Sequence, residues 1–263
     1  MRSAYARRMK EISELAREIG IPPQYLTLYG REQAKVSLRA LENRPPRGRI
    51  VLVSAITPTP AGEGKTTVSI GLAQGLCASG RPAALALRRP SMGPVFGRKG
   101  GATGGGRSSL TPAQVINLHF TGDFHAITSA NNLLAAAIDN QLHFKQTRLT
   151  PERVLWKRVL DVNDRALRAV TTGTGTAIQR ETGFNITAAS EVMAILSLSE
   201  SLADLRTRLN RIVVGFAADG TPVYAEEFKT TGPMLALLRD ALMPNLVQSV
   251  EGVPAFVHGG PFA

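Results

Sequence analysis

Apolar positions near the start of the chain recur with the period of an amphipathic helix. Over residues 4–19 these positions are Met9, Ile12, Leu15, Ala16 and Ile19. Gly20 and the Pro22-Pro23 pair then end the pattern, as expected after a helix. A second helix is predicted over Glu32–Glu42, before another pair of prolines breaks the chain.

The next apolar segment has a different pattern. RIVLVSAI, Arg49–Ile56, is a short β-branched run, which predicts a strand buried on both faces, as in a parallel sheet. A glycine-containing loop, a helix over Lys65–Ser79 and a strand over Pro82–Arg88 follow. Strand, loop, helix and strand form a βαβ motif. The pattern therefore predicts an α/β fold with a mostly parallel sheet flanked by helices.

The rest of the chain adds helices and one hairpin. Further helices are predicted within residues 121–141, 152–169, 188–198 and 202–209. Ser201 and Asp204 have the spacing of a capping pair for the last of these helices. Asp219-Gly220 suits the tight turn of a hairpin over residues 212–228.

Composition limits the class of protein. The chain has 263 residues, of which 43% are hydrophobic and 19% charged, as in ordinary globular proteins. We see no apolar run long enough to span a membrane and no apolar signal core at the start, so we expect a cytoplasmic protein. The single cysteine, Cys77, excludes an internal disulfide and fits a reducing compartment.

The net charge of +11 is unusual for this size. Such a surplus can indicate nucleic-acid binding. However, the basic residues are scattered along the chain, and aromatic residues make up only 5%. We therefore favour a basic surface around a site for anionic substrates, and we predict neither a nucleic-acid partner nor a membrane partner.

The segment TPAGEGKT has the features of a phosphate-binding loop. Backbone N–H groups and a helix N-terminus would face the phosphates, and Gly62 and Gly64 would allow a close approach. Lys65 would add a fixed positive charge, and the Thr66 hydroxyl would hold Mg²⁺. The residues predicted to bind ATP are Thr59, Pro60, Ala61, Gly62, Glu63, Gly64, Lys65 and Thr66.

Thr59 is the exception in this loop. It stands where such loops usually begin with glycine, and a β-branched residue resists positive φ, so an accidental match is the alternative. The position after a predicted strand and before a predicted helix favours a nucleotide site. We predict a P-loop-containing nucleotide hydrolase-like domain over residues 46–263, preceded by a helical segment over residues 1–45.

Two other segments leave alternatives open. The glycine-rich stretch over residues 90–106 has the composition of a linker, but Phe96, Arg98 and Lys99 suit a loop that closes over a ligand. His119 and His125 flank Asp123, which is a weak metal-binding pattern, and packing or hydrogen-bonding roles are favoured.

Longer strings carry a resemblance to one family. These strings are TPAGEGKTT, LALRRPSMGPVFGRKGGATGGG, INLHFTGDFHAITSANNLLAAAID, WKRVLDVNDRALR, GFNITAASEVMAIL, MPNLVQ and PAFVHGGPFA. In this order they resemble the formate–tetrahydrofolate ligases, also called 10-formyltetrahydrofolate synthetases, from about residue 4 to the last residue. The loop of that family also begins with threonine, so the resemblance implies that Thr59 is a family trait.

The resemblance implies a two-step ligation that uses ATP, Mg²⁺ and tetrahydrofolate. Formate attacks the γ-phosphorus of ATP to give formyl phosphate and ADP, and the N10 amine of tetrahydrofolate then attacks the formyl carbon. Lys65 would neutralise charge, Arg88 matches the family arginine that binds formate and formyl phosphate, and Asp123 matches an active-site aspartate. From the residues alone, Arg88 suits a strand-end salt bridge and Asp123 a helix N-cap.

The sequence departs from the family at several positions. Arg89 stands where the family usually has Glu or Gln, which puts a monovalent-cation site in doubt, because a guanidinium could replace the cation. Arg107 is gained, and Gln114-Val115 replaces an acidic pair. Asn185 replaces an aspartate.

The largest departure concerns length, because family members are about twice as long and their second half supplies aromatic side chains around the pterin. We expect a homo-oligomer, a complementary C-terminal chain or a truncated chain, with uncovered apolar surface that favours association. The function predicted is ATP-dependent ligation of formate to tetrahydrofolate. The alternatives are a nucleotide-binding module without ligase activity on its own and a basic nucleic-acid-binding ATPase.

Overall fold

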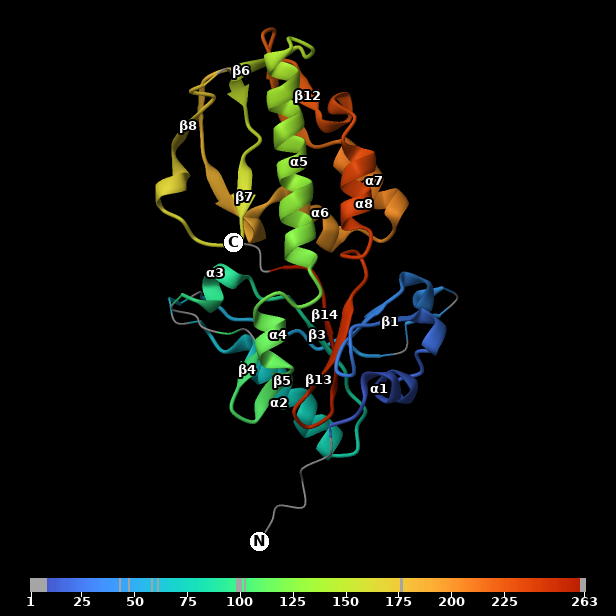
Figure 1. Cartoon of the computed structure of the whole chain (residues 1–263). Coiled ribbons are helices and arrows are strands. Elements are labelled where there is room, and N and C mark those ends of the chain that lie inside the picture. The colour runs from blue at the N-terminus through green and yellow to red at the C-terminus, as the bar shows by residue number, and fades with distance from the viewer. Residues whose placement is uncertain are drawn as a thin grey trace. The chain divides into compact units, whose positions relative to one another are not determined.

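The chain folds into two compact units in a computed structural model (Figure 1). The structure describes residues 9–42, 44–46, 48–57, 59–60, 62–97, 101, 103–175 and 177–260. Unit 1 comprises residues 1–121 and 243–259, and unit 2 comprises residues 122–242 and 260–263. Unit 2 is therefore inserted, in sequence, between two parts of unit 1. None of the helices described is long and apolar enough to cross a membrane.

Unit 1 combines short helices with one sheet. Its α-helices are α1 (Ile12–Glu18), α2 (Lys65–Ala78), α3 (Met92–Val95) and α4 (Ala113–Asn117), and its 3-10 helices are η1 (Pro23–Tyr25) and η2 (Leu38–Leu41). Its strands are β1 (Leu26–Leu28), β2 (Ala34–Val36), β3 (Leu85–Leu87), β4 (Gly104–Gly105), β5 (Ser108–Thr111), β13 (Asn245–Ser249) and β14 (Pro254–Val257). The main path of the sheet has the order β1-β2-β13-β14-β3, and β5 pairs with both β13 and β4.

The centre of this sheet comes from the far end of the sequence. All five residues of β13 are buried, as expected for a strand covered on both faces. Leu246 belongs to the apolar cluster under α1, whereas the next residue, Val247, belongs to the cluster under α2. Since successive side chains of a strand point to opposite faces, α1 and α2 cover opposite faces of the sheet.

The expected strand direction is wrong for most of the sheet. The pairs β1/β2, β2/β13, β13/β14, β5/β13 and β4/β5 are antiparallel, and only β14/β3 is parallel. Three of these antiparallel pairs, β1/β2, β4/β5 and β13/β14, are hairpins, in which a short connection forces neighbouring strands to run in opposite directions. The fold is therefore mixed α/β, but the sheet is not mostly parallel.

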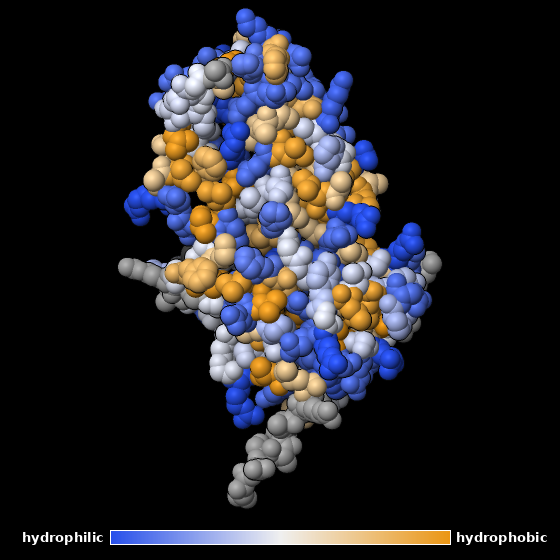
Figure 2. Space-filling view, in the orientation of Figure 1, coloured by the Kyte–Doolittle hydropathy of each residue, from blue (hydrophilic) through white to orange (hydrophobic). Residues whose placement is uncertain are grey.

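The predicted strand over Arg49–Ile56 is also wrong. These residues form no strand, and the side chains of Ile50, Leu52 and Ile56 are 96%, 84% and 105% exposed. A β-branched run becomes a strand only where a neighbour supplies hydrogen-bond partners, and β13 and β14 occupy the positions between β2 and β3. Apolar side chains elsewhere also reach the surface, in patches between polar ones (Figure 2).

This exposed run gives a testable expectation about association. We expect the double variant Ile50→Glu/Leu52→Glu to self-associate less than the natural chain, because contiguous exposed apolar side chains favour contacts between molecules. Sedimentation velocity over a concentration series measures the effect. Leu198→Glu changes a single exposed leucine of unit 2 and serves as the control. Equal association of the double variant and the natural chain would contradict the expectation.

Two predicted helices are replaced by strands. Within Glu32–Glu42 the chain forms β2 and then η2, since β2 pairs with β1 and β13 and all three of its residues are buried. Residues 152–169 lie in β6 (Leu149–Val154), β7 (Arg158–Leu160) and η3 (Ala166–Arg168) of unit 2, where β6 pairs with β11 (Val213–Ala217). In both segments, tertiary pairing overrides a helix-like spacing of apolar residues.

Unit 2 is built around one long helix. Its helices are α5 (Asp123–His143), α6 (Glu191–Leu198), α7 (Leu202–Asn210) and α8 (Thr231–Leu238), with the 3-10 helices η3 (Ala166–Arg168), η4 (Thr187–Ala189) and η5 (Ala225–Phe228). Its strands are β6 (Leu149–Val154), β7 (Arg158–Leu160), β8 (Val170–Thr172), β9 (Arg180–Thr182), β10 (Phe184–Ile186), β11 (Val213–Ala217) and β12 (Pro222–Tyr224). They form the sheets β12-β11-β6, β10-β7 and β8-β9.

Hydrogen bonds fix α5 to the segment that follows β6. The indole Nε1 of Trp156 donates to the Asn131 carbonyl over 3.0 Å, and Asn131 Nδ2 donates to the Lys157 carbonyl over 3.0 Å. Asn132 donates to the Val159 carbonyl and accepts from the Val159 N–H. Because Asn131 is buried, these bonds satisfy polar groups that would otherwise be costly to bury.

Several predicted elements are confirmed. The helix expected over Lys65–Ser79 is α2, and the helix around residues 121–141 is α5. The Ser201 hydroxyl accepts from the Asp204 N–H over 3.1 Å at the start of α7, as the capping spacing predicted. β11 and β12 form the expected antiparallel hairpin.

Candidate functional site

The predicted phosphate-binding loop leads directly into α2. Gly62 and Gly64 have φ of +86° and +70°, the left-handed region that side chains disfavour. Gly64 is the N-cap residue, and Lys65 and Thr66 are the first residues of α2. Alternating left-handed glycines turn backbone N–H groups toward one side, which produces an anion-binding concavity at a helix N-terminus.

Thr59 does not need the conformation that glycine would provide. The described non-glycine residues with positive φ are Phe120, Lys145 and Lys229, so Thr59 has negative φ. Its carbonyl accepts from the Gly62 N–H over 3.1 Å, and its N–H donates to Glu63 Oε1 over 2.5 Å. The steric objection to Thr59 therefore does not apply. Ala61, also predicted to bind ATP, lies outside the described residues.

Glu63 holds the side chain of Lys65 inside the loop. The Glu63 carboxylate forms an ion pair with the Lys65 ammonium. The hydrogen bond from Lys65 is the largest cause that lowers the pKa of Glu63, and the hydrogen bond from the Thr59 N–H adds to it. Together they lower this pKa from 4.5 to about 2. Glu63 is therefore ionised at neutral pH, and a bound polyphosphate would have to compete with it for Lys65.

The donor set at the start of α2 suits a phosphate with a divalent ion. In the part of the chain that the structure describes, no side chain caps α2 and the Thr66 hydroxyl makes no hydrogen bond. An ammonium, a hydroxyl and the first N–H groups of a 14-residue helix therefore lie together. Hydroxyl and phosphate oxygens are the ligand type that Mg²⁺ prefers.

Replacement by alanine of two glycines in this region is expected to change the free energy of unfolding in opposite directions. Gly64→Ala forces a side chain into the left-handed region, at a cost of about 1–2 kcal/mol in the free energy of unfolding. Gly75 lies in the exposed interior of α2 with open space around its Cα, so Gly75→Ala stabilises by about 0.5–1 kcal/mol. Urea unfolding measures both changes, and stabilisation by Gly64→Ala would contradict the assigned conformation.

Arg88 and Arg89 follow immediately after β3. The His258 N–H donates to the Leu87 carbonyl, and the Arg89 N–H donates to the Gly259 carbonyl, each over 3.0 Å. These bonds fix the backbone on both sides of Arg88, whose side chain is exposed. Arg88 is therefore an anchored, solvent-accessible cation at the carboxyl end of the strand.

Arg89 has a different environment from Arg88. Its side chain is only 2% exposed, and Nη2 donates to the His119 carbonyl over 2.8 Å. The guanidinium carbon lies 5.3 Å from the ring centroid of Phe120, within the range of a cation–π contact. Arg89 thus places a buried positive charge next to Arg88 in the sequence.

Asp123 begins α5 and therefore belongs to unit 2, whereas Lys65 and Arg88 belong to unit 1. The N-cap residue of α5 is Gly122, with φ of +86°, so Asp123 is not the N-cap. Its side chain is 5% exposed in the first helical turn, where a negative charge interacts favourably with the helix dipole.

Several other singled-out positions lie in unit 1, whereas Asn185, which is exposed in β10, belongs to unit 2. Arg107 forms an ion pair with Glu251 over 3.2 Å, while Gln114 and Val115 are exposed in α4. Gly104 begins β4 with φ of +85°, and a Cβ there would lie 2.0 Å from the Ser108 carbonyl oxygen. Arg98 and Lys99 lie outside the described residues. Among those described, no cluster of His, Cys, Asp and Glu forms a metal site.

The net positive charge of the chain is confined to one unit. Unit 1 has eighteen Lys and Arg against seven Asp and Glu, a surplus of 11, which equals the net charge of the chain. Unit 2 has thirteen of each and is neutral. The unit with the candidate phosphate-binding loop therefore supplies the field that attracts anions.

Comparison with known proteins identifies the family. Residues 1–263 match the family model described as formate–tetrahydrofolate ligase. The chain belongs to the formate–tetrahydrofolate ligase family. It is 56% identical to a formate–tetrahydrofolate ligase of Acidiphilium cryptum and 53% identical to one of Cereibacter sphaeroides, in each case over 99% of this chain and 48% of the relative.

A third relative in the formate–tetrahydrofolate ligase family, from Symbiobacterium thermophilum, is 54% identical over 97% of this chain and 47% of its own length. The chain spans about half the length of the curated relatives it matches. The similarity therefore covers both units of this structure and about half of a relative.

Proposed function

We propose that this chain provides the nucleotide and formate sites of a formate–tetrahydrofolate ligase. ATP binds with its phosphates at the N-terminus of α2, against Lys65 and residues 59–66, in a P-loop-like arrangement. The Thr66 hydroxyl would hold Mg²⁺, which would supply positive charge to the phosphates. Formate binds to Arg88, whose planar fork suits a carboxylate or an acyl phosphate.

The proposed chemistry has two balanced steps. A formate oxygen attacks the γ-phosphorus of ATP, the bond to the β–γ bridging oxygen breaks, and ADP leaves. The N10 amine of tetrahydrofolate then attacks the carbon of formyl phosphate, the bond from that carbon to the phosphate oxygen breaks, and the amine proton leaves with the phosphate as hydrogen phosphate. Lys65 and Arg88 hold two anions against their mutual repulsion, which is the main physical demand of the first step. Asp123 is proposed to hold a polar group near the reacting formyl group or amine.

One observation carries this proposal. Lys65 and Thr66 open α2 directly after two left-handed glycines, in the unit that holds the whole charge surplus. Family membership then supports formate and tetrahydrofolate as the substrates. We further propose that the folate site also needs residues equivalent to the part of the relatives that this chain does not match.

The proposal is tested by incubating the purified chain with ATP, Mg²⁺, formate and tetrahydrofolate and measuring 10-formyltetrahydrofolate. ADP release that requires formate supports the first step. Formation of 10-formyltetrahydrofolate that is lost in Lys65→Ala supports both steps. ATP binding without turnover would instead indicate a nucleotide-binding module. Turnover stimulated by DNA and insensitive to formate would overturn the proposal.

Arg89 is expected to replace a monovalent cation near the formate site. A buried guanidinium supplies the fixed charge that K⁺ or NH₄⁺ would otherwise provide. Exchanging tetramethylammonium for K⁺ at constant ionic strength should change formate-dependent ADP release by less than about twofold, because the guanidinium cannot be deprotonated. Strong activation by K⁺ or NH₄⁺ would contradict this role.

A further inference from the structure

Unit 2 contains a pocket that lies outside the sites assigned to ATP and formate. Its volume is about 330 Å³, and β7, β10, η3 and the residues that connect β7 to η3 supply most of its lining. β7 and β10 pair in parallel, with Phe184 opposite Arg158 and Ile186 opposite Leu160. All the residues that line the pocket belong to unit 2, so the pocket is complete within one unit.

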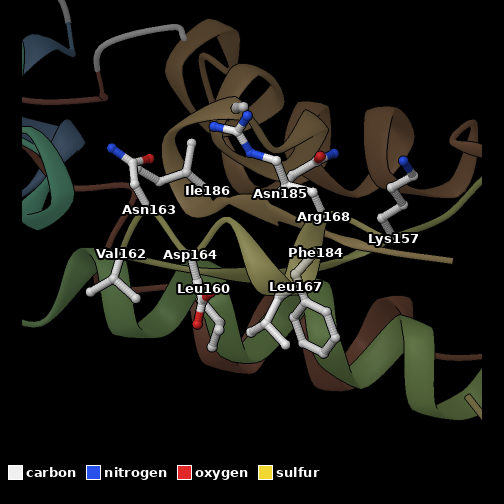
Figure 3. Close-up of a pocket in the computed structure, with 11 residues that line it drawn as sticks. Lys157, Leu160, Val162, Asn163, Asp164, Leu167, Arg168, Phe184, Asn185 and Ile186 are labelled. Carbon is white, nitrogen blue, oxygen red and sulfur yellow. The ribbon is translucent and has the colours of Figure 1, made fainter. Parts of the chain in front are cut away.

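Two basic and two amide side chains supply most of the polar lining. Figure 3 shows their polar ends toward one side of the pocket: Lys157, Asn163, Arg168 and Asn185. The ammonium, the guanidinium and the amide N–H groups are all hydrogen-bond donors. They come from different positions along the chain, so they approach the pocket from different directions. This side of the pocket therefore suits an anionic group with several acceptor oxygens.

The two cations of the pocket pair with no carboxylate among the residues that the structure describes. Arg158 and Arg180, which lie near them in the fold, both pair with Asp139, each over 2.8 Å. The Asp164 carboxylate lines the pocket but points away from the polar ends in Figure 3, and it accepts from the Ala166 N–H over 2.9 Å. A bound anion would therefore not have to displace a described carboxylate from either cation.

The other side of the pocket is apolar. Leu167 and Phe184 point to this side in Figure 3, and further apolar lining comes from Leu160, Val162 and Ile186. A volume just above the lower limit of about 300 Å³ for small-molecule sites suits a compact organic ligand better than a bare oxyanion. An apolar body attached to the anionic group would remove these side chains from water.

We propose that this pocket is a second anion site, which binds a small organic monophosphate. The phosphate lies between Lys157 and Arg168, and the organic body packs against Phe184 and Leu167. A tetrahedral phosphate can accept from donors that approach from several directions, whereas a carboxylate presents its oxygens in one plane. Two cations also balance the charge of one phosphate group, which is about −1.5 to −2 at neutral pH. This site is independent of the ligation chemistry proposed above.

Direct binding of phenyl phosphate tests the proposal without any turnover. Isothermal titration calorimetry is carried out on the natural chain, Arg168→Gln and Asn185→Asp. The first variant removes a charge-assisted hydrogen bond, and the second replaces an amide donor by a negative charge of nearly the same shape. We expect each to bind phenyl phosphate about three- to tenfold more weakly than the natural chain. Arg165→Gln changes an exposed arginine of the same segment outside the lining and should bind as the natural chain does.

Two further ligands test the two sides of the pocket separately. Inorganic phosphate lacks the apolar body and phenol lacks the anionic group, so each should bind at least about tenfold more weakly than phenyl phosphate. Equal affinity for inorganic phosphate would show a site for the oxyanion alone. Equal affinity for phenol would show an apolar pocket without an anion site. Either result would overturn the proposal.

Lys65→Ala separates this pocket from the start of α2, where the phosphates of ATP are proposed to bind. Phenyl phosphate should bind to Lys65→Ala with the affinity that it has for the natural chain. Binding that is lost in Lys65→Ala and kept in Arg168→Gln would place the phosphate at α2 and overturn the proposal. No binding, or equal binding to the natural chain, Arg168→Gln and Asn185→Asp, would also overturn it. ATP binding, measured in the same samples, tests the nucleotide site separately, so failure of one site is distinguishable from failure of the other.

Discussion

Lys65→Ala is expected to slow formyl phosphate formation by roughly 10²–10³, the usual effect of removing one preorganised electrostatic contact. The ammonium begins α2 beside the left-handed glycines and forms an ion pair with Glu63. In the proposed complex, ATP would draw the ammonium from this carboxylate to a polyphosphate with greater negative charge. Single-turnover ADP release in the presence of formate measures the loss.

Lys10 provides a matched control for this prediction. Its ammonium also forms an ion pair with a glutamate, Glu18, in the same unit. Lys10→Ala removes the same kind of group and should leave ADP release unchanged. A Lys65→Ala enzyme with full activity would refute the role of Lys65, whereas equal losses in both variants would indicate a general effect of charge.

Arg88→Gln is expected to lower formate-dependent ADP release by about 10²-fold, since the guanidinium offers two parallel donors to a carboxylate. Its backbone is fixed by bonds at Leu87 and Arg89, so the variant should fold normally. ATP affinity should change little, because the phosphates are assigned to α2. Rates measured over a range of formate concentrations separate binding of formate from the chemical step.

Two further variants sharpen the test of Arg88. Arg88→Lys keeps the charge but loses the planar fork, so its activity should lie between those of the natural chain and Arg88→Gln. Arg81→Gln removes an exposed arginine that precedes β3 in the sequence, whereas Arg88 follows β3. Arg81→Gln should leave formate-dependent ADP release unchanged. If Arg88→Gln and Arg81→Gln behave alike, Arg88 does not bind formate.

Elements with local signals were predictable from the sequence. The glycine turn before Lys65 specifies the start of α2, the Ser201–Asp204 spacing specifies the cap of α7, and Asp219-Gly220 specifies the hairpin turn. In each case the residues that decide the structure are neighbours in sequence. For the same reason, the loop proposed to bind phosphate could be located from its residue types and their spacing.

Elements decided by distant pairing were not predictable in this way. Arg49–Ile56 has the composition of a buried strand but pairs with nothing in the described structure, while Ala34–Val36 pairs with β13 from more than 200 residues later. The pocket in unit 2 was missed for the same reason. A helix over residues 152–169 would have kept Lys157 and Arg168 about 16 Å apart along one face and placed Asn163 on another face. The pairing of β7 with β10 instead brings all three residues to one pocket of unit 2.

The position of β13 has a consequence for the order in which the chain can acquire its structure. Residues 122–242, which form nearly all of unit 2, are translated before Asn245–Ser249. These residues therefore leave the ribosome while the sheet of unit 1 still lacks its central strand, β13. Contacts of such large sequence separation form late and slowly. The later-encoded unit can therefore mature first, and the N-terminal residues remain without their sheet until the hairpin of β13 and β14 arrives.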